Sequence, residues 1–478
     1  MSPSAISTPR RQDNNNDGQH PTKTAALATA PPPLERSTDH LPKQSHFSKH
    51  TQSSFNTNSN RQPRIASYFR IDMANGHEWD EVDNPLEDPE ELRVLFTALD
   101  SYMQYEKVAR FNVTHLRRQS FYALPDAQWK MLAAPPFNFL ETLSKVDDAI
   151  GINADLAKAI AKHGLHSFND PSQNPEADDV SMPQEWVGVA KHGDIDKARS
   201  TLRQFFRDWS AEGASEREKS YGPVMRALEK ERARAPENSG LRVLVPGAGL
   251  GRLVFDLAKN GYHAEGNEIS YHQLLASSYI LNFCERAGKH TIYPWIHAFS
   301  NHQTRENHLR GYSVPDIHPG TALMQSSNIG TMSMTAADFL CLYGDHEHRE
   351  HYDAVAAVFF LDTAPNLIRY LGVIFSCLKP GGILINVGPL LWHFENHAPG
   401  NHGLDDDGDG EHDYKNSSGI ADPGSFELAD DEVMALVEKL GFVVESREMG
   451  VEAPYIHDAD SMLKTVYRAS TWVARKPL

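Results

Sequence analysis

The chain has 478 residues, 40% of them hydrophobic, which is enough for two or three domains and a sizeable core. Its formal net charge of −18 argues against DNA or RNA as a substrate, because an acidic surface repels phosphates. No apolar run approaches the roughly 18 residues of a membrane-spanning helix, and the three cysteines have no metal-binding spacing and suit a reducing compartment.

A segment rich in Ser, Thr, Asn, Gln and Pro occupies residues 1–75. Such a composition cannot bury a core, so we expect a disordered tail. The tail carries a formal charge of +4, which leaves −22 on the rest of the chain. Asp13, Asp17 and the lack of an apolar segment argue against a secretory or transit peptide. We therefore expect a cytoplasmic protein, with the nucleus as a second location.

Residues 76–235 have the pattern of a helical region. Asp88-Pro-Glu-Glu91 places a cap and two acids before apolar residues that recur with a period close to four. Near the end of the region, Gln204, Arg207 and Asp208 fall within about one helical turn. Periodicity alone favours a solvated polar face here. The guanidinium of Arg207, however, could also bind a ligand carboxylate through two hydrogen bonds.

Seven apolar segments predict strands in the remaining chain. They alternate with helical stretches, as in a doubly wound, Rossmann-like α/β sheet. Helices are expected at 253–259 and 366–378, and Lys379-Pro-Gly-Gly382 is expected to end the second helix. The expected strands are 241–245, the residues leading to 268, 332–336, 351–362, 383–387, 442–445 and 470–474.

A glycine-rich loop follows the first expected strand, where Gly247, Gly249 and Gly251 read G-x-G-x-G. Glycine lets backbone approach a ligand closely, and Glu268, 21 residues after Gly247, lies where an acid binds both ribose hydroxyls of a nucleoside. A dinucleotide fingerprint would need its third glycine at Arg252. The spacing therefore favours S-adenosylmethionine, which has no pyrophosphate, and a tight turn without a ligand is the plainer alternative.

Polar residues also follow the later strands and should lie on the same edge of the sheet as the loop. Asp338 either caps the next helix or bonds an adenine amino group, with Phe339 packed on the base. Asp362 is either a turn residue or an acid that faces the transferred group. His393 is one of 24 histidines, and a lone histidine is usually structural.

Several strings resemble the carnosine N-methyltransferase family, over roughly residues 79–478. The most specific are Tyr-Pro-Trp-Ile-His at 293–297 and Gly-Pro-Leu-Leu-Trp-His-Phe-Glu-Asn at 388–396. The others are Leu-Val-Pro-Gly-Ala-Gly-Leu-Gly-Arg-Leu at 244–253, Gly-Asn-Glu at 266–268, Phe-Phe-Leu-Asp-Thr-Ala at 359–364 and Leu-Lys-Pro-Gly-Gly at 378–382. The resemblance implies a class I methyltransferase domain over 236–478. It would move a methyl group from S-adenosylmethionine to an imidazole nitrogen of carnosine, giving anserine, or of a related histidine-containing peptide.

The resemblance also implies roles for single residues. Those expected to bind the methyl donor are Gln204 and Arg207 at its methionine end, Gly247 with Gly249 and Gly251 in the loop, Glu268 at the ribose, Asp338 and Phe339 at the adenine, and Val358 through its main chain. Those expected to bind the dipeptide are Asp362, His393, Tyr455 and Tyr467. A small peptide is the expected partner and a homodimer is left open, whereas neither nucleic acid nor membrane is expected.

Methyl transfer from a sulfonium is an in-line displacement, so catalysis should come mainly from aligning an imidazole lone pair with the methyl carbon. A carboxylate that accepts a bond from the other ring N–H would fix the tautomer and offset the positive charge that develops on the ring. We assign this role to Asp362. His393 and Tyr467 are expected to hold the dipeptide, and Phe339 to help exclude water.

An acidic insertion at about 398–424 interrupts the family pattern. Asp405, Asp407, Asp409 and Gly410 match the first half of a calcium loop, but the twelfth position is Asn416 where a glutamate is expected. We therefore expect a solvated acidic loop and no metal site.

Three other functions stay open. A methyltransferase acting on a protein histidine or another small imidazole would use the same residues. A nicotinamide-dependent dehydrogenase would need the G-x-G-x-x-G spacing, which is missing. A non-enzymatic scaffold that only binds S-adenosylmethionine would need a broken acceptor side, yet Asp362 and His393 are both present.

Overall fold

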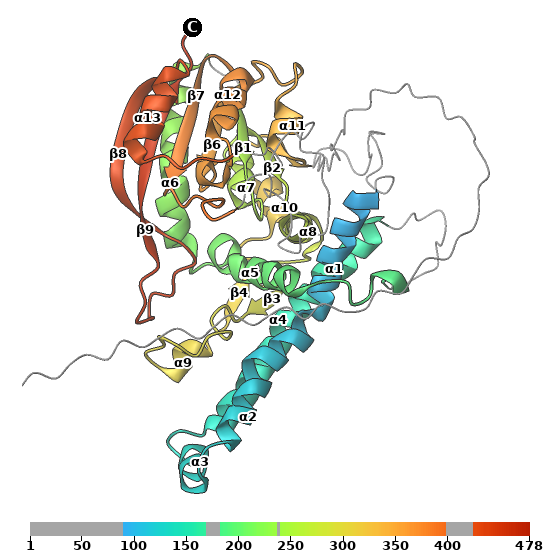
Figure 1. The fold of residues 1–478 in the computed structure, drawn as a ribbon. Coiled ribbons are helices and arrows are strands. Elements are labelled where there is room, and N and C mark those ends of the chain that lie inside the picture. Colours follow the sequence, from blue (N-terminus) through green and yellow to red (C-terminus); the bar gives the residue numbers. More distant parts are fainter. Residues whose placement is uncertain (1–88, 169–181, 237–239, 398–423) are drawn as a thin grey trace, which may run out of the picture. The chain divides into compact units, whose positions relative to one another are not determined.

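A mixed seven-stranded sheet is the centre of the fold in the computed structural model, which describes residues 89–168, 182–236, 240–397 and 424–478. Its strands are β1 (Arg242–Pro246), β2 (His263–Glu268), β5 (Met332–Ala336), β6 (Tyr352–Val358), β7 (Leu378–Gly388), β8 (Val443–Pro454) and β9 (Val466–Arg475). They lie in the order β5-β2-β1-β6-β7-β9-β8 (Figure 1). The first five in this order pair in parallel, whereas β9 pairs antiparallel with both β7 and β8. The predicted doubly wound, seven-stranded α/β sheet is confirmed.

Two predicted features lie outside the described residues. They are the tail at 1–75 and the calcium-like pattern from Asp405 to Asn416 in the acidic insertion. A short antiparallel pair, β3 (His290–Ile292) and β4 (Tyr312–Val314), is separate from the main sheet. Within the described ranges, no helix combines the length and the apolar character that crossing a membrane would require.

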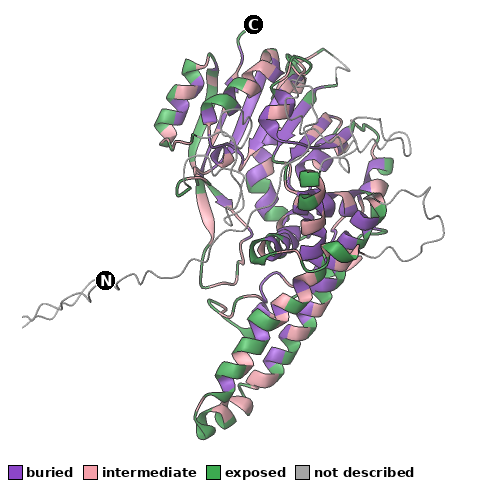
Figure 2. Ribbon diagram, turned by 45° about the vertical axis from the view of Figure 1, so that its right-hand side comes forward, coloured by how far each residue is buried: buried purple, intermediate pink, exposed green. Residues whose placement is uncertain are grey.

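Alternate residues of the same strand pack against different helices. In β1, Val243 and Val245 belong to a core that includes α6 (Ala214–Arg234) and α7 (Arg252–Lys259). Leu244 belongs to a second core that includes α11 (Phe339–Tyr343), α12 (Leu367–Cys377) and α13 (Asp430–Lys439). Figure 2 shows the central strands as buried. The sheet is covered on both faces, which explains why its strands read as continuous apolar runs.

The N-terminal helical region is confirmed over its described residues. α1 (Pro89–Ala109) begins within the predicted capping segment and packs beside α4 (Phe139–Phe168) and α5 (His192–Trp209). A turn at 210–213 separates α5 from α6, and a Cβ on Gly213 would lie 2.3 Å from the carbonyl oxygen of Phe206. The remaining helices are α2 (Leu116–Tyr122), α3 (Asp126–Ala133), α8 (Tyr271–Ser278), α9 (Arg305–His308) and α10 (Pro319–Gln325), with π-helical segments Arg110–His115 and Tyr279–Phe283 and a 3-10 turn Gln184–Trp186.

The apolar segment at 351–362 does not form one strand, which corrects the prediction. β6 ends at Val358 because Phe359 adopts a left-handed backbone conformation with a φ of 53°. The Phe359 N–H still donates to the carbonyl oxygen of Val387, at 2.9 Å, and a 3-10 turn at Leu361–Thr363 follows. Asp362 therefore lies on a turn beyond the strand, at the edge of the sheet where ligands bind.

The last strands also differ from the prediction. Lys379-Pro-Gly-Gly382 follows the end of α12, as predicted, but it lies within β7, which begins at Leu378 and not at the predicted 383. It bulges out of the pairing with β6, and Gly381 supplies the positive φ of 81° that such a bulge favours. β8 and β9 extend well beyond the predicted 442–445 and 470–474, because they form one hairpin whose loop is 455–465. The added residues of β8 and β9 show little apolar periodicity, so the sequence does not mark them as strand. They are strand because their backbone N–H and C=O groups bond across the hairpin.

Candidate active site

The glycine loop between β1 and α7 is held in a conformation that favours glycine. Gly247, Gly249 and Gly251 have φ values of 65°, 56° and 72°. A Cβ on Gly249 would lie 3.0 Å from the side-chain nitrogen of Gln204, and one on Gly247 would lie 3.0 Å from the ring of Phe360. The loop therefore meets α5 on one side and the segment after β6 on the other.

Glu268, the last residue of β2, is buried directly beneath this loop. Its carboxylate accepts three backbone N–H bonds of 2.9 Å, from Gly249 to one oxygen and from Ile269 and Ser270 to the other. Burial raises the pKa of Glu268, although the three amides oppose this. A carboxylate has about four acceptor positions, so the present contacts leave about one for a ribose hydroxyl. Binding both hydroxyls requires one amide to release the carboxylate.

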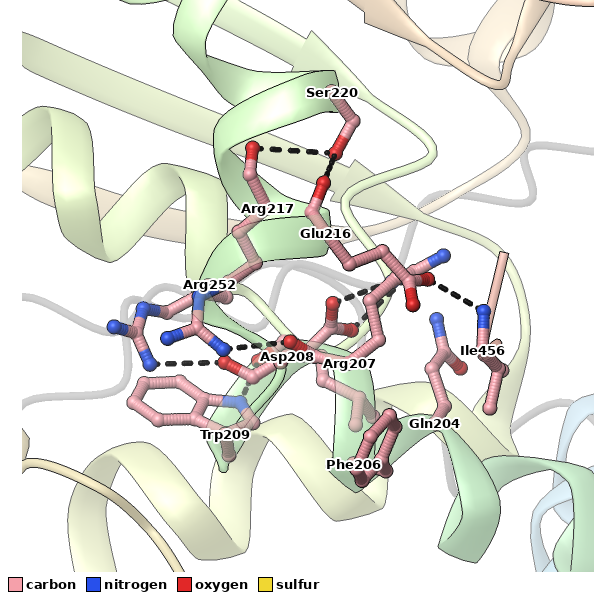
Figure 3. A network of polar contacts seen from close by, with 12 residues as sticks. Gln204, Phe206, Arg207, Asp208, Trp209, Glu216, Arg217, Ser220, Arg252 and Ile456 are labelled. Atoms are coloured by element: carbon pink, nitrogen blue, oxygen red, sulfur yellow. Dashed lines mark hydrogen bonds and ion pairs between the residues drawn. The ribbon is translucent and has the colours of Figure 1, made fainter. Parts of the chain in front are cut away.

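Arg207, on α5, is enclosed and forms a two-pronged pair with the carboxylate of Asp208. Its Nε and one Nη lie 2.7 and 3.0 Å from the two oxygens, and Tyr221 also donates to Asp208, at 3.1 Å (Figure 3). The Arg207 side chain is only 11% exposed, so the interpretation of this helix face as solvated is wrong. Burial alone would lower the pKa of Arg207, but Asp208 holds it well above its ordinary value.

The second Nη of Arg207 forms no hydrogen bond within the described part of the chain. Gln204 lies one turn earlier on the same helix, is buried, and its side-chain oxygen lies 3.1 Å from the side-chain amide of Gln273. Figure 3 shows Gln204 and Arg207 directed to the same region. A cation with a free N–H group beside a glycine loop is suited to a carboxylate ligand. This geometry fits the amino acid end of S-adenosylmethionine.

At the predicted adenine end, Asp338 caps α11. One of its oxygens accepts bonds from Leu340 N at 2.8 Å and Cys341 N at 3.0 Å, which confirms the capping interpretation. Phe339 is buried in the second core, with its ring stacked on Tyr370 at a centroid distance of 5.5 Å. The ring of Phe339 is thus part of the core. Adenine contacts from these two residues stay a prediction, as does a main-chain contact from Val358 at the end of β6.

On the acceptor side, Asp362 connects two segments. One carboxylate oxygen accepts the N–H of Leu391 at 3.0 Å, and the backbone carbonyl of Asp362 accepts the N–H of His393 at 3.1 Å. Asp362 is 4% exposed, whereas His393 is exposed. Burial raises the pKa of Asp362, opposed by the Leu391 amide and by His393. The structure thus brings Asp362 and His393 together, as predicted, although His393 follows β7 by several residues.

Three aromatic rings form one cluster, and one of them, the ring of Tyr467, is close enough to Asp362 to interact with its carboxylate. The centroid of Phe359 lies 5.2 Å from Tyr455 and 6.1 Å from Tyr467, and the two tyrosines are 6.1 Å apart. Burial raises the pKa of Tyr467, with further contributions from Tyr455 and Asp362. The guanidinium carbon of Arg207 lies 5.1 Å from the centroid of Tyr455. The aromatic rings therefore connect the donor side to the acceptor side.

Phe359 is not among the residues expected from the sequence. Its left-handed backbone conformation is strained for a residue with a side chain, and such strain concentrates at functional sites. Two aromatic residues directly after a buried strand, Phe359 and Phe360, are the signal that the sequence offers. Tyr221, which donates to Asp208, carries no such signal because it belongs to a different helix, α6.

Comparisons with known proteins agree with this arrangement. A family model described as carnosine N-methyltransferase matches residues 184–478. The carnosine N-methyltransferase of Schizosaccharomyces pombe is 36% identical over 390 residues, covering 81% of this chain and 97% of that protein. The Rattus norvegicus protein of the same name is 34% identical, covering 80% of this chain and 86% of that protein. "Carnosine N-methyltransferase unmet" of Drosophila melanogaster is 35% identical, with coverages of 65% and 62%.

Proposed function

The chain belongs to the carnosine N-methyltransferase family, and from this we infer its reaction. It is an enzyme that transfers a methyl group from S-adenosylmethionine to an imidazole nitrogen of carnosine, and the product is anserine when the dipeptide is carnosine. One observation carries the assignment of the site. The buried carboxylate of Asp362 interacts with Tyr467, which belongs to a cluster of three aromatic rings, and another ring of this cluster, Tyr455, contacts the cation of the donor side.

On the donor side, the residues hold and orient S-adenosylmethionine. S-adenosylmethionine, when bound, supplies a methyl group on a sulfonium, which leaves without help from an acid. Arg207 binds the donor carboxylate through its free N–H group, and Gln204 lies beside it at the loop. Glu268 accepts a bond from the ribose, and the glycine loop permits close approach of backbone. These contacts fix the direction in which the methyl group faces.

On the acceptor side, Asp362 accepts the N–H of one imidazole nitrogen, which leaves the lone pair of the other nitrogen free for attack. Its negative charge also stabilises the positive charge that develops on the ring, and burial strengthens this effect. Phe359, Tyr455 and Tyr467 enclose the ring and exclude water. His393, exposed and tied to Asp362 through its backbone, contacts the remainder of the dipeptide.

The acceptor can be tested with the purified full-length chain, methyl-labelled S-adenosylmethionine and a panel of acceptors. The panel is carnosine, homocarnosine, free histidine and a histidine-containing protein fraction. We expect label on an imidazole nitrogen of carnosine, with slower or no labelling of free histidine. Preferential labelling of a protein would show that the acceptor is a protein histidine and not carnosine. Absence of any labelled imidazole would refute the reaction.

Replacing Glu268 with glutamine is expected to weaken S-adenosylhomocysteine binding by about 10-fold, the scale of one lost hydrogen bond to a charged group. The amide keeps the shape but offers one acceptor oxygen where the carboxylate offers two. Calorimetry should show the same loss for 5′-methylthioadenosine, which retains the ribose but lacks the amino acid end. Unchanged affinity for both nucleosides would remove Glu268 from the ribose site.

Two further proposals concern assembly and location. Exposed apolar side chains on the N-terminal helices support a homodimer, among them Met103, Phe111, Leu116 and Met131. A chain mass of 53.4 kDa makes a dimer easy to distinguish by light scattering. The three cysteines, all within the described residues, form no disulfide, which supports a reducing compartment, with the cytoplasm as the proposed location and the nucleus as a second one.

A further inference from the structure

The hairpin of β8 and β9 carries two of the three aromatic rings of the acceptor side. Tyr455 is the first residue of its loop, 455–465, and Tyr467 lies near the start of β9. The outer part of the loop is attached to α9 and to the segment before it: Met462 N donates to Asn301 O at 2.7 Å, and the Asn307 amide, on α9, donates to Asp458 at 2.9 Å. The inner end, next to Tyr455, needs a separate attachment.

That attachment comes from α6, about 240 residues earlier in the chain. Both oxygens of Glu216 accept backbone bonds from the loop, from Ile456 N at 2.5 Å and from His457 N at 3.2 Å (Figure 3). Arg203 on α5 donates to the carbonyl oxygen of Ile456 at 3.1 Å. The amide and the carbonyl of Ile456 are therefore both held by charged side chains of the helical region.

The backbone at Ile456 would not adopt its conformation without such contacts. Its φ is 47°, a left-handed value that is rare for a β-branched residue and costs roughly 1–3 kcal/mol in general. Glu216 is itself 4% exposed, and burying a carboxylate is unfavourable unless it is well bonded. Burial raises the pKa of Glu216, although the two amides and Arg207 oppose this. A strained residue is thus held by a buried charge, directly beside an acceptor-side tyrosine.

We propose that Glu216 is a positioning residue for the acceptor: by fixing Ile456 it sets the position of Tyr455 and so the fit of the dipeptide. This inference rests on the proposed function, because it assigns the aromatic rings to the acceptor. Tyr455 is held from a second direction by Arg207, whose guanidinium lies against its ring. Glu216 touches neither the donor residue Gln204 nor Asp362 through any hydrogen bond in the described chain.

The test is Glu216→Gln in the full-length chain. The glutamine oxygen can accept one of the two amides, but its NH2 group cannot accept the other, so one loop N–H loses its partner. We expect the KM for carnosine to rise about 10-fold, on the scale of one hydrogen bond to a charge, with kcat nearly unchanged. Donor affinity should not weaken, because removing a negative charge near Arg207 does not reduce its attraction for an anion.

A matched control is Glu218→Gln on the same helix. Glu218 is 70% exposed, and its one ion pair among the described residues is with Arg226, at 3.1 Å, so its replacement should leave both KM values unchanged. Amide hydrogen exchange provides a readout that does not depend on the acceptor. In Glu216→Gln, exchange should accelerate at Ile456 and His457, while the outer attachment at Met462 keeps its protection.

The outcomes separate the two claims. Wild-type protein that methylates no imidazole refutes the proposed function, and the exchange experiment alone then decides whether Glu216 holds the loop. Active wild-type protein with an unchanged carnosine KM in Glu216→Gln overturns the positioning role. An equal loss of donor affinity and of kcat would also overturn it, because a merely structural residue gives that result.

Discussion

Replacing Asp362 with alanine is expected to lower turnover by about 100-fold or more, the scale of removing one preorganised charge from a reacting site. The substitution removes the acceptor of the imidazole N–H, so the ring is no longer held in one tautomer and its developing charge is not stabilised. Donor affinity should stay nearly unchanged, because no hydrogen bond in the described chain joins Asp362 to the donor-side residues. Single-turnover rates and calorimetry with S-adenosylhomocysteine measure the two quantities separately.

Alanine also removes the bond that Asp362 accepts from Leu391, so a second variant is needed. In Asp362→Asn the side-chain oxygen can still accept the Leu391 N–H, whereas the charge and the second acceptor oxygen are lost. Because burial raises the pKa of Asp362, the ionised form is less favourable in the folded than in the unfolded chain. This unfavourable contribution is present above the raised folded-state pKa and disappears below the ordinary unfolded value. The asparagine variant should therefore melt no lower than wild type near neutral pH while turning over slowly.

Wild-type turnover in Asp362→Asn would show that the charge is not used in the reaction. Slow turnover together with a low melting temperature would instead point to the Leu391 attachment. The two substitutions thus distinguish catalysis from the support of the segment that carries His393.

The sequence predicts the donor side more completely than the acceptor side, and the reason is physical. A glycine loop, the acid at the end of the next strand and their spacing are local consequences of one βαβ unit, so Gly249 and Glu268 could be placed in advance. The end of β6 could not, because a positive φ at Phe359 depends on packing against Tyr455 and Tyr467, about 100 residues later. The apolar run in the sequence continues past Val358 through Phe359, so the sequence predicts one longer strand in place of a strand that ends at Val358.

The helical region contributes more to the site than its periodicity indicates. An amphipathic pattern identifies α5 and α6 but not which polar residues are enclosed. The β8–β9 loop, a much later segment, covers Arg207 and Glu216: Tyr455 lies against the first, and Ile456 and His457 donate to the second. The family resemblance assigns a donor-binding role to Arg207, because this position matches the family pattern. It assigns no role to Glu216.

Replacing Arg207 with lysine is expected to weaken S-adenosylmethionine binding by roughly 10- to 100-fold. Arg207 can bind Asp208 through two nitrogens and still present a third to the donor carboxylate, whereas a lysine has one ammonium for both. The positive charge is retained, so the buried Asp208 is not left without a counter-ion and the fold should survive. Arg199→Lys is the matched control, since Arg199 lies on the same helix, is exposed and, within the part of the chain that the structure describes, forms an ion pair with Asp196 alone, at 3.2 Å.

The decisive comparison uses two nucleosides. S-adenosylhomocysteine has the amino acid end and 5′-methylthioadenosine lacks it, so Arg207→Lys should weaken the first and leave the second unchanged. Glu268→Gln should weaken both equally, because both nucleosides carry the ribose. If Arg207→Lys weakened both nucleosides to the same extent, Arg207 would act by supporting the loop and Tyr455 rather than by binding the donor. The carboxylate of S-adenosylmethionine would then require a different partner.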